Sequence, residues 1–331
     1  MKIMVYEARP DERADLEKQA ALHGVELSVT DAVPTLENAS LAAGCSGVSI
    51  LGQGCIDAAL LDAYHALGIR YLSTRTIGYD HIDLDHARSI GLRVCSASYA
   101  PNGVADFTVM MILMCLRHYK QALWRGQVND FSLTGLQGRE MKDLTIGIIG
   151  TGRIGAQVAR NLSGFGCRIL AYDLRRNPAV EPQVTYVDFD TLLAQSDVIT
   201  LHMPLLDSNR HIINRESIAK MRDGVVIVNC SRGELADIEA LIEGIETGKI
   251  GALGMDTVEG DEGIIHADHR VDILPNRNWF YLHQFRNVIM TQHMAFYTDA
   301  AVSSMVDCGI GGICQMAAGE SCPTELTGPV Q

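Results

Sequence analysis

The stretch Thr145-Ile-Gly-Ile-Ile-Gly-Thr-Gly-Arg-Ile-Gly155 carries the pattern G-x-G-x-x-G directly after an apolar, β-branched run. The pattern alone is weak, because glycines in an ordinary turn also produce it. Here it opens a helical segment, residues 153–162, and an acidic residue, Asp173, ends the next β-branched run. Strand, glycine turn, helix and acid in this order are typical of a dinucleotide-binding α/β domain.

Each position of the motif has a physical task in holding a dinucleotide. Gly150 permits the tight turn, Gly152 lets the backbone approach the pyrophosphate, and Gly155 lets the helix pack close to the strand. The first helical turn contains Arg153 and Ile154. Its free N–H groups and the positive end of the helix dipole favour phosphate binding.

Asp173 lies where the ribose of the dinucleotide is expected. Its carboxylate would accept hydrogen bonds from the ribose hydroxyls and repel a 2′-phosphate, which predicts NAD rather than NADP. Arg175 and Arg176 follow closely and could soften the exclusion of NADP.

Short β-branched runs alternate with helical stretches on both sides of the motif, which predicts parallel sheets covered by helices. Strands are expected at 2–6, 25–29, 47–51, 70–73, 92–95, 144–149, 168–172, 198–201, 225–229, 252–255 and 288–291. Helices are expected at 12–23, 56–66, 83–90, 104–125, 153–162 and 295–318. The pattern predicts an α/β protein of two doubly wound parallel-sheet (Rossmann or flavodoxin-like) domains with a cleft between them.

Composition narrows the class of protein. The net charge of −13 argues against nucleic acid and membrane surfaces as partners. Charged residues within positions 7–13 argue against a secretory signal, and nine cysteines without a C-x-x-C pair suggest reduced thiols and a cytoplasmic location. The nearest approach to a metal motif, His266-Ala-Asp-His269, lacks a third ligand at a useful spacing, so no metal is expected.

Three unusual polar residues follow predicted strands in the second half: Arg232, Asp261 and His293. Ligands of open α/β sheets bind beyond the carboxyl ends of strands, so these loops should converge. An arginine can grip a carboxylate bidentately, and a histidine can give a proton to a carbonyl oxygen. A neighbouring carboxylate raises the pKa of an imidazole and orients it. The set therefore suits reduction of a 2-oxo acid.

Structural roles are the alternative for each residue taken singly. Arg232 could cap a surface loop, Asp261 could be a solvated loop acid, and His293 could be a satisfied core histidine. Their occurrence together behind a dinucleotide motif favours the catalytic interpretation.

Several motifs in order make the chain resemble the D-isomer-specific 2-hydroxyacid dehydrogenases over nearly its whole length. They are Arg75-Thr-Ile-Gly-Tyr-Asp-His-Ile-Asp83, Pro101-Asn-Gly-Val-Ala-Asp106, the glycine motif, Asn229-Cys-Ser-Arg-Gly233 and Gln292-His293. The resemblance implies an NAD-dependent oxidoreductase in which Arg232 and His293 are the family's arginine and histidine. It also implies a homodimer, joined through the long helix after Pro101.

The same resemblance implies a division of labour along the chain. Residues 1–100 and 300–331 would form the substrate-binding (catalytic) domain, and residues 101–299 the NAD-binding Rossmann domain. Backbone N–H groups near Ile77 and Gly78 would join Arg232 in holding the substrate carboxylate. The cofactor would further be lined by Met203, Pro204, Asn209, Cys230, Ser231 and Asp256.

One departure from the family concerns the catalytic acid, normally a glutamate five residues after the aspartate that maps onto Asp256. That position is Asp261 here, with Glu262 next to it. We expect Asp261 to pair with the histidine, with Glu262 as the alternative.

The substrate implied by overall resemblance is 2-oxoglutarate, reduced to (R)-2-hydroxyglutarate, with Arg75 or Gln53 as candidates for binding the distal carboxylate. A lactate- or isocaproate-type acid is the alternative. A non-enzymatic NAD(H)-sensing corepressor is a further alternative, because fold does not fix function.

Overall fold

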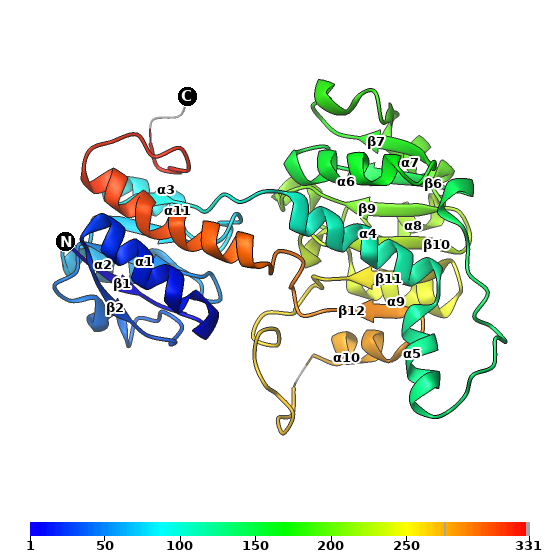
Figure 1. The fold of residues 1–331 in the computed structure, drawn as a ribbon, viewed down its shortest axis with the longest axis horizontal. Helices are drawn as coiled ribbons and strands as arrows, with labels where there is room; N and C mark the ends of the chain where they lie inside the picture. Colours follow the sequence, from blue (N-terminus) through cyan, green and yellow to red (C-terminus); the bar gives the residue numbers. More distant parts are fainter. Residues whose placement is uncertain (275, 329–331) are drawn as a thin grey trace. The chain divides into compact units, whose positions relative to one another are not determined.

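The computed structural model describes residues 1–274 and 276–328 and divides into two compact units. The first contains Met1–Ala100 with Tyr297–Gln331, and the second contains Pro101–Phe296. Each unit has its own parallel sheet with helices on both faces (Figure 1). The predicted class of two parallel-sheet α/β domains is therefore confirmed.

The sheet of the first unit has the order β2-β1-β3-β4-β5, with every pair parallel. Its strands are β1 (Lys2–Val5), β2 (Glu26–Val29), β3 (Gly47–Ile50), β4 (Tyr71–Thr74) and β5 (Arg93–Cys95). Its helices are α1 (Arg13–His23), α2 (Ala58–Ala66), α3 (Leu84–Ser89) and α11 (Asp299–Ala317). Every expected strand of this unit is present within one or two residues of the predicted bounds.

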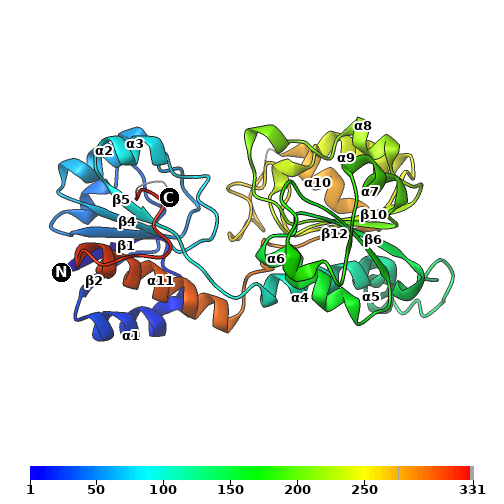
Figure 2. The same cartoon turned by 90° about the horizontal axis from the view of Figure 1, so that it is seen from above.

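Two cores, one on each face, hold this sheet. Leu16 of α1 and Ile310 of α11 pack together on one face, whereas Leu60 of α2 and Ala87 of α3 belong to the core on the other (Figure 2). The chain thus returns to the first unit at its C-terminal end, through α11.

The apolar helix α11 satisfies the length and composition of a membrane span, with a mean hydropathy of 1.2 over 18 residues. Half of that window is buried, and Val306, Ile310 and Ile313 pack against Ile3 and Val5 of β1. These contacts make it a core helix of the first unit.

The sheet of the second unit has the order β12-β11-β10-β9-β6-β7-β8. Its strands are β6 (Thr145–Ile149), β7 (Arg168–Tyr172), β8 (Thr185–Tyr186), β9 (Val198–Leu201), β10 (Val225–Asn229), β11 (Ile250–Met255) and β12 (Val288–Met290). Its helices are α4 (Asn102–Leu116), α5 (Tyr119–Gln127), α6 (Arg153–Ser163), α7 (Phe189–Gln195), α8 (Arg215–Lys220), α9 (Ile238–Glu246) and α10 (Arg277–Gln284). Strand order reverses beside β6, and such switch points are where ligands bind in open α/β sheets.

The single helix expected at 104–125 is wrong: it is broken into α4 and α5. His118 adopts a left-handed conformation, with φ of 49°, between them. The freed carbonyl of Leu116 accepts a hydrogen bond from the backbone N–H of Arg139, 3.1 Å away in the returning segment. The break depends on this tertiary contact, because neither glycine nor proline marks it. The short β8 and the helices α7, α8, α9 and α10 were also not among the expected elements.

Candidate active site

The glycine motif forms a tight turn between β6 and α6. Gly150 has φ of +92°, and a Cβ added there would lie 2.6 Å from the carbonyl oxygen of His202. A Cβ on Gly155 would lie 1.9 Å from the carbonyl oxygen of Gly150. Only glycine fits either position, because a side chain would collide with backbone.

Gly152 is the residue before α6, and a Cβ built on it meets no described atom within 4 Å. The first helical turn, with exposed Arg153 and half-buried Ile154, therefore begins beside open space. A bare helix N-terminus with room in front of it fits the pyrophosphate of a dinucleotide.

Asp173 lies directly after β7 and contacts the glycine turn. Its Oδ2 accepts hydrogen bonds from the backbone N–H and the hydroxyl of Thr151, at 2.6 and 3.1 Å, and its Oδ1 accepts one from the backbone N–H of Arg175. The guanidinium of Arg176 lies over the ring of Tyr186. Asp173 thus fixes the glycine turn from the end of β7.

The loops after β9 and β10 are joined by side-chain hydrogen bonds. The hydroxyl of Ser231 donates to the carbonyl oxygen of Met203 at 2.6 Å, and the amide of Asn209 donates to that of Pro204 at 2.8 Å. Cys230 is buried, and burial raises the pKa of its thiol. The structure therefore gathers these expected cofactor-lining residues, with Cys230 as a packing residue rather than a reactive thiol.

Arg232 lies in the turn after β10, and the side chain of Asn229 shapes that turn. The Asn229 amide donates to the carbonyl oxygen of Arg232 at 2.7 Å and accepts from the backbone N–H of Ser231 at 3.0 Å. A Cβ on Gly233 would lie 2.3 Å from the carbonyl carbon of Val258. Glycine at this position therefore lets the arginine turn press against the loop that follows β11.

Asp261 lies on that neighbouring loop. Its Oδ2 accepts a hydrogen bond from the backbone N–H of Val258, the residue that touches Gly233. Burial raises the pKa of Asp261 to about 6, whereas Glu262 is exposed. The contact through Val258 places the Asp261 carboxyl in the same loop cluster as Arg232.

His293 follows β12, the strand next to β11, and Asp256 fixes its segment. Asp256 is only 1% exposed. Its Oδ1 accepts from the hydroxyl of Thr291 at 2.6 Å and from the backbone N–H of Met294 at 2.9 Å, and its Oδ2 accepts from that of Ala295 at 2.8 Å. The carboxylate expected to line the cofactor therefore bonds on both sides of the histidine.

Two further rings surround the imidazole of His293, which has φ of 51°. The centroids of the His266 and Phe296 rings lie 6.1 and 6.2 Å from its own. The sequence did not indicate either residue as a substrate contact. For Phe296, the one feature that could have done so is its position three residues after His293.

In the first unit, Ile77 and Gly78 lie after β4, and Gly78 is held by the hydroxyl of Thr76, which donates to its carbonyl oxygen at 2.6 Å. Arg75 is fully buried and forms an ion pair with Glu12 at 3.0 Å. It also donates to the carbonyl oxygen of Tyr6 at 2.9 Å. Arg75, one of the two candidates for binding a distal carboxylate, is therefore wrong for that role, because its guanidinium is part of the core.

The histidines considered for a metal take other contacts. His269 Nδ1 lies 2.8 Å from Asp272, and His266 Nε2 lies 3.3 Å from the carbonyl oxygen of His293. Within residues 1–274 and 276–328, no three metal-ligating side chains come together.

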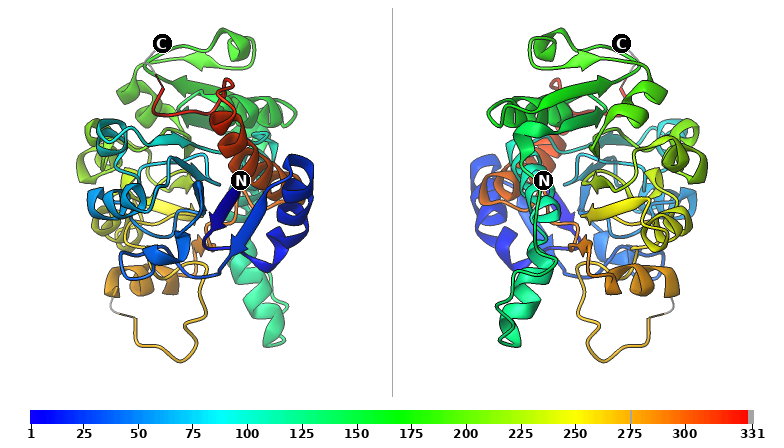
Figure 3. Two further views of the ribbon diagram at one scale, coloured as in Figure 1. Left: turned by 90° about the vertical axis from the view of Figure 1, so that its left-hand side faces the viewer. Right: turned by 90° about the vertical axis from the view of Figure 1, so that its right-hand side faces the viewer.

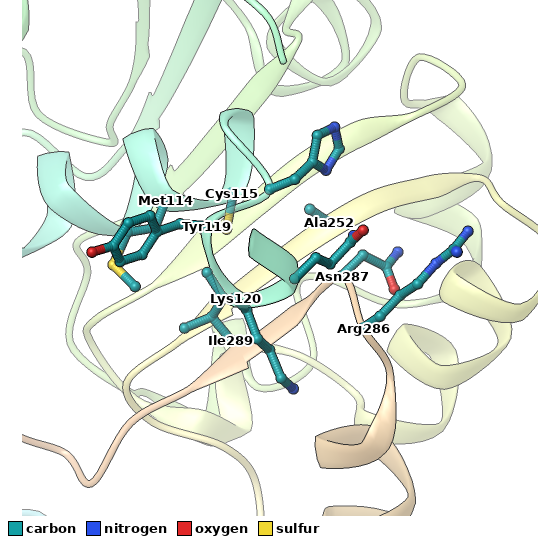
Figure 4. Close-up of a pocket in the computed structure, with 10 residues that line it drawn as sticks. Met114, Cys115, Tyr119, Lys120, Ala252, Arg286, Asn287 and Ile289 are labelled. Carbon is teal, nitrogen blue, oxygen red and sulfur yellow. The ribbon is translucent and has the colours of Figure 1, made fainter. Parts of the chain in front are cut away.

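The second unit also has a small pocket between the α4–α5 junction and the strands β11 and β12 (Figure 4). Lys120 beside it donates to the carbonyl oxygens of His283, Phe285 and Val288. The pocket is lined by Met114, Cys115, His118, Tyr119, Lys120, Gln121, Ala252, Arg286, Asn287 and Ile289. It marks where the α4–α5 junction packs on β11 and β12, and it contains none of the expected site residues.

Comparisons with known proteins, by sequence and by structure, indicate one enzyme family. Residues 109–295 match the model of the D-isomer specific 2-hydroxyacid dehydrogenase NAD binding domain. The chain is 42% identical to an aromatic 2-oxoacid reductase of Clostridium sporogenes, over 93% of both chains. It is 36% identical to a D-lactate dehydrogenase of Escherichia coli, over 98% of this chain and all of the relative.

Solved structures agree with these sequence matches. The NAD complex of a D-isomer specific 2-hydroxyacid dehydrogenase from Lactobacillus delbrueckii ssp. bulgaricus superposes with a TM-score of 0.82 at 30% identity, covering 98% of this chain and all of the other. Because these relatives are enzymes, the comparisons favour turnover over the alternative of a non-enzymatic NAD(H) sensor.

Proposed function

The chain belongs to the D-isomer specific 2-hydroxyacid dehydrogenase family, an NAD-dependent group of oxidoreductases, and we propose that Arg232, Asp261 and His293 carry out its chemistry. The observation that supports this most is the Asp256 carboxylate, which fixes the His293 segment beside the strand whose loop carries Asp261. A histidine held in this way is suited to deliver a proton at a fixed point.

In the proposed reaction, the guanidinium of Arg232 grips the carboxylate of the 2-oxo acid bidentately. We also assign a substrate-binding role to the backbone N–H groups of Ile77 and Gly78. NADH, when bound, supplies the hydride that reaches the 2-carbon. His293 donates its proton to the carbonyl oxygen, and the Asp261 carboxylate stabilises the imidazolium beforehand. Oxidation of the hydroxy acid uses the same groups in reverse.

We assign the dinucleotide to the second unit. The turn and first helical residues, Gly150, Gly152, Arg153, Ile154 and Gly155, would face its phosphates. The carboxylate of Asp173 would accept hydrogen bonds from the ribose hydroxyls. Residues 101–299 would thus form the NAD-binding domain, and residues 1–100 with 300–331 the substrate-binding domain.

For the substrate side chain, we place large apolar or aromatic groups first. The rings of His266 and Phe296 pack against the imidazole of His293, with centroids 6.1 and 6.2 Å from its own, and give its surroundings an aromatic surface against which such a group would pack. The aromatic 2-oxoacid reductase of Clostridium sporogenes is a relative of this chain, which supports the same choice.

2-Oxoglutarate, giving (R)-2-hydroxyglutarate, is the second candidate. A buried distal carboxylate needs donors in the site. With Arg75 held in the core, the remaining candidate is Gln53, an exposed residue in the loop after β3. That loop is fixed by Glu7, whose carboxylate accepts from the backbone N–H groups of Gly52 and Gln53.

The test is NADH oxidation with phenylpyruvate, 2-oxoisocaproate, pyruvate and 2-oxoglutarate, followed by chiral analysis of the products. We expect kcat/KM to be highest for phenylpyruvate, with the R product from each acid. A preference for 2-oxoglutarate that Gln53→Leu abolishes would instead establish the second candidate. No turnover with any of the four acids would contradict the proposed function.

We further propose a homodimer formed through the segment from α5 to residue 136, which projects away from the sheet of its own unit (Figure 3). No residue of α5 is buried. Trp124, Phe131 and Leu133 are 64, 78 and 83% exposed. Large apolar side chains gathered on one exposed segment are typical of an interface.

A cytoplasmic location is part of the same proposal. All nine cysteines are free thiols, as expected for a reducing compartment.

A further inference from the structure

The C-terminal segment after α11 lies along β5, the edge strand of the first sheet. The backbone N–H of Ser96 donates to the carbonyl oxygen of Thr324 at 3.0 Å, and that of Leu326 donates to the carbonyl oxygen of Val94 at 2.8 Å. Cys95 and Glu325 pair in antiparallel fashion. The segment thus covers the strand edge in the manner of a sixth strand.

An ion pair ties the same segment to β5. Nε and Nη2 of Arg93 donate to the carboxylate of Glu325, at 2.8 and 2.6 Å, and Nη1 donates to the carbonyl oxygen of Met316 at 2.7 Å. Arg88 donates to the carbonyl oxygen of Leu326 at 2.9 Å. The segment is therefore held in one register on the edge strand.

Two thiols meet beneath this segment. Cys95 is the last residue of β5 and fully buried, and Cys322 lies in the turn that leads into the segment, 8% exposed. Gly312 of α11 leaves the space for both: a Cβ there would lie 2.6 Å from the sulfur of Cys95 and 3.5 Å from that of Cys322. The absence of a side chain at Gly312 lets the two sulfurs approach each other from separate parts of the chain.

The surroundings of the two thiols give them different chemistry. A hydrogen bond from the Cys95 thiol, helped by the Thr324 hydroxyl 3.6 Å away, lowers the pKa of Cys322 to about 6. The same hydrogen bond, followed by burial, raises the pKa of Cys95. The negative charge of the nearby Glu325 raises the pKa of Cys322, but this effect is smaller than the lowering by the hydrogen bonds. These surroundings favour the thiolate at Cys322 over that at Cys95, so Cys322 is suited to be the nucleophile and Cys95 the resolving partner.

We propose that Cys95 and Cys322 are an oxidation site, a dithiol that a hydroperoxide converts into a disulfide joining β5 to the C-terminal segment. The Cys322 thiolate attacks the peroxide oxygen, the O–O bond breaks, and an alcohol or water leaves once protonated. The thiol of Cys95 then attacks the resulting sulfenic acid, the S–O bond breaks, and water leaves. Two thiols are oxidised by one hydroperoxide, and a thiol reductant reverses the step.

The remaining cysteines provide internal comparisons. Cys55 is exposed, and Cys308, which donates to the carbonyl oxygen of Ser98 at 3.4 Å, is half-buried in the first unit. Burial raises the pKa of Cys308, which disfavours its thiolate. Cys308 interacts electrostatically with both Cys95 and Cys322, so the experiment must distinguish it from them.

The test is peptide mapping of the whole protein after titration with hydrogen peroxide and alkylation of the remaining thiols. We expect a linked peptide pair containing Cys95 and Cys322 at peroxide concentrations that leave most Cys308 alkylatable, and its loss on adding dithiothreitol. Cys322→Ser should abolish the link, whereas Cys308→Ser should retain it. The C-terminal segment of the oxidised protein should also resist carboxypeptidase longer than that of the reduced protein.

Mapping of the unmodified chain does not depend on how any variant folds. Cys95 and Cys322 remaining thiols while Cys55 or Cys308 is oxidised would overturn the proposal, as would a dominant link between any other two cysteines. Neither outcome bears on the dehydrogenase chemistry, which is measured separately by NADH oxidation.

Discussion

The hydroxyl of Thr291 donates to Oδ1 of Asp256 across 2.6 Å, joining the end of β12 to the end of β11. The same carboxylate accepts the backbone N–H groups of Met294 and Ala295. His293 therefore sits in a short segment held on both sides by one buried charge.

This relationship predicts that Asp256→Asn lowers kcat by roughly tenfold or more, because a hydrogen bond to a charged group is worth about 1.5–3 kcal/mol. NADH affinity, measured by fluorescence titration, should change little. Thr291→Val removes a single donor and should have a smaller effect on kcat. Weakened NADH binding with kcat retained would show instead that Asp256 is a cofactor contact.

Asp173 predicts the choice of cofactor. NADH should exceed NADPH in kcat/KM, and Asp173→Ala should narrow the gap, since it removes both the ribose contacts and the repulsion of a 2′-phosphate. Because Asp173 also holds the backbone of Thr151, the variant should bind NADH less tightly as well. Thr151→Val keeps the backbone N–H bond to Asp173 but removes the hydroxyl contacts with Asp173 and Tyr186, and it should keep the preference for NADH. Equal use of both cofactors by the unmodified enzyme would refute this role.

Asp261 predicts a pH-dependent defect. With its pKa near 6, the Asp261 carboxyl is charged only above that pH and can stabilise the His293 imidazolium only there. Asp261→Asn should therefore move the basic limb of the pH profile for 2-oxo acid reduction to lower pH by about one unit, roughly 1.4 kcal/mol. Below pH 6 the rates of the Asp261→Asn variant and of the unmodified enzyme should converge.

Glu262→Gln is the matched control, since the exposed Glu262 lies next to Asp261 on the same loop. It should leave the pH profile nearly unchanged. A shift with Glu262→Gln and none with Asp261→Asn would show that Glu262 is the partner of the histidine.

Much of this arrangement follows from local sequence, and the rest from contacts distant in sequence. The glycine turn is readable because its glycine spacing is local and Gly155 packs directly on Gly150, although Gly150 also meets the backbone of His202 after a different strand. Arg75 was one of two candidates for binding a distal carboxylate, and its actual partner, Glu12, lies in a different element. Charge at a strand end does not distinguish a buried ion pair from a ligand site.

Asp256 illustrates the same limit. Resemblance placed it beside the cofactor, but its hydrogen bonds run to residues 291–295, which only the pairing of β11 with β12 brings near. The break at His118 likewise depends on the return of Arg139 to the end of α4. The hydrophobic periodicity of the local sequence predicts neither contact.

The exposed apolar segment predicts the oligomeric state. Phe131→Asp combined with Leu133→Asp should convert a dimer into a monomer in sedimentation velocity runs at micromolar concentration, because burying two carboxylates in an apolar contact is costly. Leu22→Asp, a change at a 69% exposed position on α1, should leave the dimer intact. An unmodified chain that sediments as a monomer would contradict the proposed interface.

The central claim is that His293, held by Asp256 and assisted by Asp261, gives the proton during 2-oxo acid reduction. Single-turnover reduction of phenylpyruvate by NADH-loaded enzyme, comparing the unmodified chain with His293→Gln, tests it most directly. We predict a rate roughly 10²–10⁴-fold lower in the variant, the usual contribution of a general acid, with the NADH dissociation constant nearly unchanged. A variant that reduces the acid at close to the unmodified rate would contradict the account.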